Sequence, residues 1–190
     1  MKMKRFFPLL CMLAFVASFL WSCEPVQKVS EIPEIHFKKL VFEDRTDDLG
    51  ETFTKGILTF SFIDGDGDLG VKPEEKNPDG TYVPGGGMSR IYYVWYQKKT
   101  DGTYEAYQFP KGDITSSSEI PYGRVMDKSE AQNKTLKGTI EIEMQTPSDT
   151  QGIDIMRVEF FITDRAENQS NIEYTPDFSI LNPPEEILSD

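Results

Sequence analysis

Three aspartates alternate with glycines in the segment IDGDGDLG, residues 63–70. Asp64, Asp66 and Asp68 come at the end of an apolar, alternating run, where like charges so close together repel one another. A bound cation would relieve that repulsion, because alternate residues of a tight loop can direct their carboxylates inward while glycines supply the bend. The spacing therefore predicts a metal loop, and a solvated Asp–Gly turn is the alternative.

The donor atoms indicate which metal would bind. The aspartates have the 1, 3, 5 spacing of an EF-hand, but Leu69 stands where an EF-hand requires glycine, and Pro73 interrupts the loop. A strand rather than a helix leads into it. Every candidate ligand is nevertheless an oxygen atom, and the chain has one histidine. These donors favour Ca²⁺ over zinc as a structural cofactor.

A second polar stretch, ITDRAENQSN at residues 162–171, ends another predicted strand. Asp164 follows that strand directly, and Asn168 comes shortly after it. If the two strands are neighbours that run in the same direction, their polar ends meet at one pole of the fold. Asp164 or Asn168 would then complete the metal shell. The alternative is a plain turn in which Asp and Asn side chains cap backbone groups.

The two stretches together resemble motifs of small Bacteroidetes-type lipoproteins that have a single immunoglobulin-like domain. The resemblance is carried by F-x-F-x-DGDGDLG and DRAxNxSN and covers most of residues 33–180. The family has glycine after the alanine of the second motif, whereas this chain has Glu167, which alters that turn. The resemblance implies an envelope location and a β-sandwich, and it implies no activity.

Catalytic chemistry finds little support in the residues. His36 is the only histidine, and its parity in the first predicted strand is opposite to that of Ile35 and Phe37, which predicts a surface position. A Ser–His–Asp or Cys–His site is therefore nearly excluded. A carboxylate pair of the glycoside hydrolase type is compatible with the composition, but no pair of acids stands out. We predict that the protein is not an enzyme.

Aromatic residues crowd the predicted strand RIYYVWYQKK, residues 90–99. Tyr93 and Trp95 share one face of that strand, and Tyr92 and Tyr96 share the other. One set is expected in the core, where a buried tryptophan on a central strand is usual. The other set, Tyr92 and Tyr96, would suit stacking on sugar rings. The alternative function is thus that of a glycan-binding accessory lipoprotein of an outer-membrane uptake system.

The first 22 residues predict a lipoprotein signal peptide. A basic start, MKMKRFF, precedes an apolar stretch too short to span a bilayer comfortably, which ends in Leu20-Trp21-Ser22-Cys23. That end resembles a lipobox, in which cleavage leaves a lipidated cysteine. Acyl chains on Cys23 would anchor the protein in the membrane, and Cys11 would leave with the signal. An ordinary secretory signal or an uncleaved anchor is the alternative.

The charge balance limits the partners. The net charge is −12, and removal of residues 1–22 takes away three basic residues and no acidic one, which gives about −15. Nucleic acid and anionic head groups require a basic face, so neither is expected. Envelope proteins or glycans are the expected partners of an outer-membrane lipoprotein. The sequence does not decide between a periplasmic and a cell-surface location, because only Glu24 stands where surface-exported lipoproteins have an acidic run.

The rest of the chain predicts an all-β fold, because about seven strand signals alternate with turn signals and no convincing amphipathic helix occurs. Such strands, each apolar on one face, favour an antiparallel immunoglobulin-like β-sandwich. The polar segments 72–89 and 110–135 would be excursions from it. The expected organisation is a signal peptide at 1–22, the lipidated cysteine and a tether at 23–32, the sandwich at 33–182, and a C-terminal tail at 183–190.

Overall fold

The computed structural model describes residues 29–70, 78–79, 89–109, 116–119, 134–147, 152 and 154–189. The predicted signal peptide and Cys23 lie outside these residues. Within them the regular structure is all β, and no helix could span a membrane. The strands are β1 (Glu34–Thr46), β2 (Thr52–Asp64), β3 (Arg90–Lys98), β4 (Tyr104–Ala106), β5 (Ser116–Glu119), β6 (Leu136–Gln145), β7 (Ile155–Thr163), β8 (Glu173–Tyr174), β9 (Phe178–Ser179) and β10 (Glu186–Leu188).

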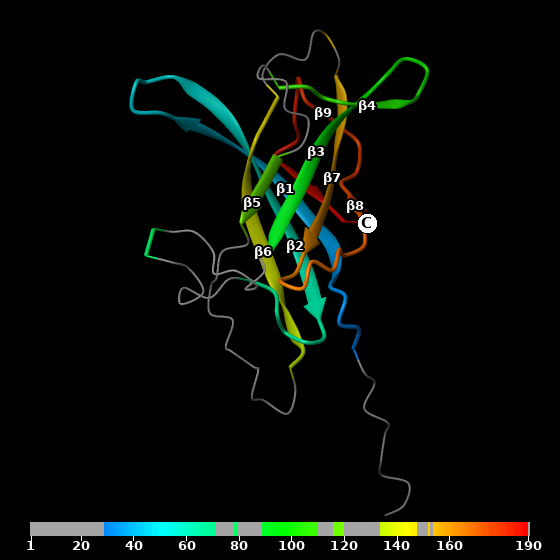
Figure 1. The fold of residues 1–190 in the computed structure, drawn as a ribbon. Helices are drawn as coiled ribbons and strands as arrows, with labels where there is room; N and C mark the ends of the chain where they lie inside the picture. The colour runs from blue at the N-terminus through cyan, green and yellow to red at the C-terminus, as the bar shows by residue number, and fades with distance from the viewer. Residues whose placement is uncertain are drawn as a thin grey trace, which may run out of the picture.

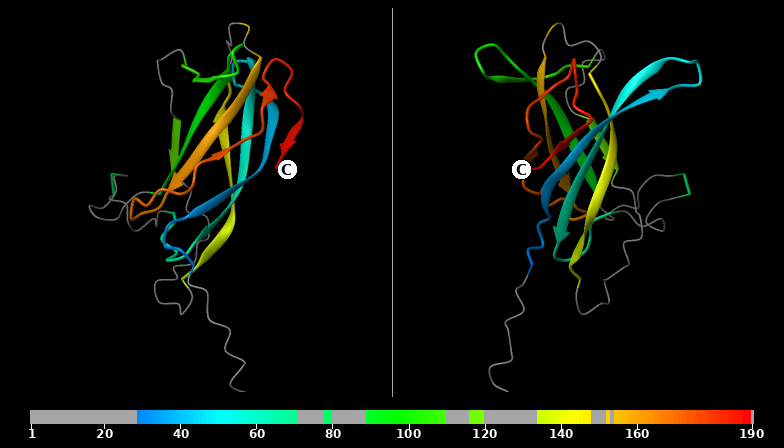
Figure 2. Two further views of the ribbon diagram at one scale, coloured as in Figure 1. Left: turned by 90° about the vertical axis from the view of Figure 1, so that its right-hand side faces the viewer. Right: turned by 180° about the vertical axis from the view of Figure 1, so that it is seen from behind.

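The strands form two antiparallel sheets that face each other (Figures 1 and 2). One sheet has the order β10-β1-β2-β6, and the other has the order β4-β3-β7-β8, with β5 beside β3 and β9 beside β7. The chain crosses between the sheets from β2 to β3, from β5 to β6, from β6 to β7 and from β9 to β10, and such repeated crossing is usual in immunoglobulin-type sandwiches. The predicted all-β sandwich is confirmed.

The structure has more strands than the sequence predicts. β5 lies in a segment predicted as an excursion, and β10 lies in the predicted C-terminal tail and pairs with β1 through Lys39, Leu40 and Val41. Neither strand shows the alternation that marks the long strands, because β5 reads SSSE and β10 is too short to display a period. β10 is seated by Ile187, which is buried.

Alternating apolar residues of both sheets form the core between them. In β6, Ile140, Ile142 and Met144 are buried while the residues between them are exposed. Aromatic rings meet across the two layers: the ring centroids of Phe60 and Phe160 are 5.3 Å apart. Full burial of each large apolar side chain contributes about 1.5–3 kcal/mol, which makes this layer the main source of stability.

Strands β2 and β7 bring the two polar motifs to one end of the sandwich. They lie in different sheets, and in Figure 1 both arrows point toward the same end of the molecule. The sequence predicts that the motifs meet if these strands are neighbours that run in the same direction. The two strands are neighbours across the core, in facing sheets, rather than within one sheet.

Candidate metal centre

Three aspartates converge where β2 and β7 end. Asp64, Asp68 and Asp164 each offer a carboxylate oxygen, and these oxygens lie within 4.8 Å of one another. We call these three residues the aspartate cluster. It is the one group of three or more metal-ligating side chains in the described parts of the chain, and the sequence predicts all three as ligands.

Asp64 and Asp68 of the cluster each leave one buried carboxylate oxygen without a hydrogen-bond donor. Asp64 and Asp164 are both 0% exposed. The Leu69 N–H donates to Asp64 Oδ2 over 3.1 Å. Asp64 Oδ1, however, is buried and has no hydrogen-bond partner, and the same holds for Asp66 Oδ1 and Asp68 Oδ1. A buried, unpaired carboxylate oxygen is unfavourable by several kcal/mol, so these oxygens favour a cation among them.

Burial and mutual repulsion make Asp64 hard to ionise in the absence of a cation. Burial is the largest cause that raises the pKa of Asp64 to about 7, and the charges of Asp66 and Asp68 act in the same direction. The hydrogen bond from the Leu69 N–H opposes them. Near neutral pH the metal-free carboxyl is therefore poised between its two forms, and a cation would favour the ionised one.

The pKa of Asp68 is also raised, though less than that of Asp64. Burial raises the pKa of Asp68 to about 6, and the charge of Asp164 is the next cause, followed by that of Asp66. The Arg165 guanidinium lowers this pKa, as does the hydrogen bond from the Ala166 N–H. The nearby positive charge of Arg165 thus compensates the repulsion only in part.

The second motif holds the first through both backbone and side chain. The Ala166 N–H donates to Asp68 Oδ2 over 3.1 Å, and Arg165 Nε donates to the Asp68 backbone oxygen over 2.7 Å. Asp164 Oδ1 accepts the Asn168 N–H over 2.8 Å, and Asp164 Oδ2 accepts the Asn168 side-chain amide over 2.9 Å. The two motifs therefore lock the sheets together at this pole.

Glycines allow the aspartate loop to fit between its neighbours. Gly67 has a φ of 72°, a left-handed conformation that side chains disfavour, and a Cβ there would lie 2.2 Å from the Lys134 backbone oxygen. Gly70, with a φ of 97°, donates its N–H to the buried Ser89 Oγ over 2.8 Å. The alternation of Asp and Gly thus serves close packing as well as the bend.

Glu167 adopts a left-handed backbone conformation of the kind that favours glycine. It has a φ of 66° and is the one residue other than glycine with a positive φ in the described residues. Its N–H donates to the Asp164 backbone oxygen over 3.3 Å, which closes the turn. The turn therefore contains a residue with a Cβ in the left-handed region, which costs backbone strain.

The remaining predicted ligands have supporting positions. Asp66 is close enough to Asp64 to raise its pKa, but it is not one of the three converging residues. Asn168 directs its amide nitrogen at Asp164, so it orients a ligand in this arrangement. Sequence reasoning missed Arg165 as a contact of the loop. The sequence did contain an indication of this contact, because Arg165 is the only basic residue in the stretch at 162–171 and is adjacent to Asp164.

Tyr92 and Tyr96, predicted as a ligand platform, lie half-buried on the outer face of β3. Tyr92 stacks on Phe161, with ring centroids 5.0 Å apart. On the same sheet, the Arg157 guanidinium carbon lies 3.6 Å from the centroid of the Tyr104 ring. The Tyr92 ring thus packs on a neighbouring ring of the same sheet, and the sugar platform stays a prediction.

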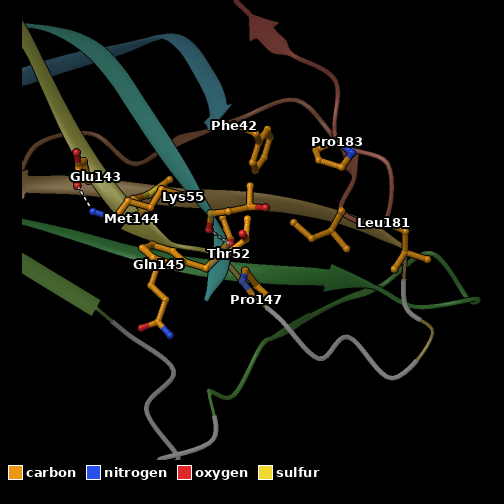
Figure 3. A pocket seen from close by; sticks show the side chains of 13 residues that line it. Phe42, Thr52, Lys55, Glu143, Met144, Gln145, Pro147, Leu181 and Pro183 are labelled. Atoms are coloured by element: carbon orange, nitrogen blue, oxygen red, sulfur yellow. Dashed lines mark hydrogen bonds and ion pairs between the residues drawn. The ribbon is translucent and has the colours of Figure 1, made fainter. Parts of the chain in front are cut away.

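A groove of about 860 Å³ lies at the other end of β2 (Figure 3). Phe42, Met144 and Leu181 are among the apolar residues that line it. Its Lys55 and Glu143 form an ion pair with each other, and threonines and Gln145 make the rest of the lining as polar as it is apolar. The groove therefore offers room but no cluster of groups that could carry chemistry.

His36 is exposed in β1, as the sequence predicts. Its Nε2 lies 3.2 Å from Glu34 Oε1, and its Nδ1 lies 3.6 Å from Glu173 Oε1.

The chain matches no protein-family model, no curated protein and no solved structure. The aspartate cluster is therefore the site from which a function is best argued.

Proposed function

We propose that this chain is a non-catalytic β-sandwich protein of the cell envelope that binds Ca²⁺ at the aspartate cluster as a structural ion. The observation that carries the proposal is the buried Asp64 Oδ1, which has no hydrogen-bond partner within a group of three converging carboxylates. Oxygen donors alone favour Ca²⁺ over zinc or copper. The ion would clamp the two sheets at the pole where β2 and β7 end.

The anchoring part of the proposal rests on the sequence. Lipid on Cys23 would tether the sandwich to the outer membrane, where it would bind or support other envelope components. Metabolic labelling with a palmitate analogue tests this step, and a Cys23→Ser variant should lose both the label and its place in the membrane fraction. Label retained by that variant would contradict the anchor.

Thermal unfolding tests the ion directly. The full chain, kept in detergent micelles, is stripped with EDTA and then melted in EDTA, in calcium and in magnesium. An ion that binds the folded state alone stabilises it by about 2.7 kcal/mol at a concentration 100-fold above Kd. For a chain of this size we expect calcium to raise the midpoint by about 5–10 °C.

Matched variants locate the effect. Asp164→Asn and Asp68→Asn each remove a ligand charge, and each should abolish the calcium-dependent rise. Asp48→Asn, in the exposed turn between β1 and β2, should keep it. A midpoint that does not respond to millimolar calcium, or an equal rise in the Asp164 and Asp48 variants, would overturn the proposal.

A further inference from the structure

The aspartate loop lies directly against the start of the described chain. A Cβ placed on Gly65 would lie 2.2 Å from the Ser30 backbone oxygen and 2.5 Å from the Val29 backbone oxygen. Backbone therefore touches backbone, and the close approach requires glycine at position 65. We call residues 29–32 the leading segment; it belongs to the predicted tether.

The leading segment and β1 are held by different contacts. In the leading segment, the Ile32 N–H donates to Ser30 Oγ over 3.0 Å, which is a bond within the segment itself. Ile32 is 53% exposed. Ile35, three residues further on, is fully buried, and its backbone is bonded to the Asn171 side chain and paired with β2. The leading segment thus contacts the aspartate loop at Gly65, whereas β1 is held by β2 and Asn171.

The loop in turn depends on the group that neutralises its aspartates. Asp64 and Asp68 come from the same loop as Gly65, and their unpaired oxygens repel one another unless a cation lies among them. Three glycines give this loop many alternative conformations into which it can relax. Relaxation would move Gly65 away from Val29 and Ser30.

We propose that cation binding at the aspartate cluster holds the leading segment against the loop, so that the ion controls how firmly the sandwich is joined to its predicted membrane tether. This inference rests on the proposed function. With the ion bound, the sandwich is held close to its tether in a fixed orientation. Without it, the contact of residues 29 and 30 with Gly65 is lost.

Hydrogen exchange measured by mass spectrometry tests the inference on the full chain in detergent micelles, in EDTA and in calcium. We expect calcium to slow the exchange of the amides in residues 30–32 by about tenfold or more, since local opening governs exchange there. The amides of Ile35 and Phe37, which β2 and Asn171 hold in either state, serve as the internal reference.

A glycine variant separates the contact from the ion. Gly65→Ala keeps every carboxylate but places a methyl group on the Ser30 oxygen, so calcium should still raise the unfolding midpoint while the protection of residues 30–32 is lost. Gly56→Ala is the matched control on β2, because its nearest contacts would be ordinary ones at 3.4 Å or more. If Gly65→Ala fails to fold, the wild-type comparison decides alone.

The outcomes for the inference and for the proposed function are distinct. A calcium-dependent rise in the midpoint with unchanged exchange in residues 30–32 overturns the inference and leaves the proposed function standing. No rise and no protection rejects both. Protection that spreads equally to Ile35 and Phe37 also overturns the inference, because it indicates general stabilisation rather than a local contact.

Discussion

The Asn171 side chain pairs with the backbone of Ile35 as a neighbouring strand would. Its Oδ1 accepts the Ile35 N–H over 2.8 Å, and its Nδ2 donates to the Ile35 carbonyl over 2.9 Å. Asn171 belongs to the motif that comes after β7, and Ile35 belongs to β1 in the other sheet. One side chain therefore bridges the two sheets at the pole of the aspartate cluster.

Replacement of Asn171 by alanine should destabilise the fold. It removes both hydrogen-bond partners of the part-buried Ile35 backbone. At about 0.5–1.5 kcal/mol for each bond, we expect a loss of about 1–3 kcal/mol in the free energy of unfolding. Urea unfolding measures it. Asn182→Ala, at an exposed position, serves as the control, and equal effects of the two substitutions would contradict the prediction.

Glu167→Gly should stabilise the protein. A residue with a Cβ in the left-handed region loses about 1–2 kcal/mol, and the greater freedom of glycine in the unfolded chain offsets part of the gain. The net increase should be about 0.5–1 kcal/mol in the free energy of unfolding. Glu167→Ala retains the Cβ and hence the strain, so a similar gain from alanine would show that strain is not the cause.

Metal-free protein should lose stability as the pH rises toward neutrality. The folded state raises the pKa of Asp64 to about 7 and that of Asp68 to about 6, both above their ordinary value of 3.8. Between about pH 4 and pH 7 the folded chain thus retains protons that the unfolded chain has released, so the free energy of unfolding falls with rising pH. This contribution is complete below about pH 4 and gone above about pH 7.

Urea midpoints in EDTA at about pH 5 and about pH 8 measure this dependence. Saturating calcium should flatten it, because the ion binds the ionised carboxylates and gains affinity as they lose protons. Asp64→Asn should flatten it in EDTA as well. A urea midpoint of the metal-free protein that is higher at about pH 8 than at about pH 5 would contradict the prediction, because it would show that folding does not raise the pKa values of Asp64 and Asp68.

Arg157→Lys should weaken the outer face of the β3–β7 sheet. The Arg157 guanidinium carbon lies 3.6 Å from the Tyr104 ring centroid and 4.5 Å from that of Tyr174. An ammonium group cannot stack on rings as a planar guanidinium does, so the loss should be about 0.5–1 kcal/mol. The control is Arg45→Lys, whose arginine pairs with Glu43 at the surface. A loss of the same size from both variants would count against the stacking.

Features that depend on local alternation are predicted well from the sequence. The alternating patterns at residues 136–145 and 153–163 predict strands, and β6 and β7 begin and end within two residues of these ranges. Tyr93 and Trp95, which share one face of their predicted strand, are both buried. Short strands such as β10 carry no periodic signal, because three residues cannot display a period of two. Their existence depends on a neighbour that only the folded chain supplies.

The aspartate cluster was only partly predictable from the sequence. The carboxylates of Asp64, Asp68 and Asp164 are visible as candidate ligands in the sequence, since oxygen donors at the ends of strands are informative. Which strands face each other is a property of the whole sandwich, and for that reason the sequence left open how the strands before the two motifs are placed. The contact of Gly65 with Ser30 was equally invisible, because it depends on the path of a segment without regular structure.

The hydrogen bond between Asp68 and Ala166 joins residues 98 positions apart, and this separation has a consequence for the folding rate. A contact across so long a loop forms only after much chain entropy has been lost, so the cluster is complete late, when both sheets have already met. Calcium would then bind after the transition state and could not speed folding. It would instead slow unfolding, and the ion would lengthen the lifetime of the folded protein rather than hasten its formation.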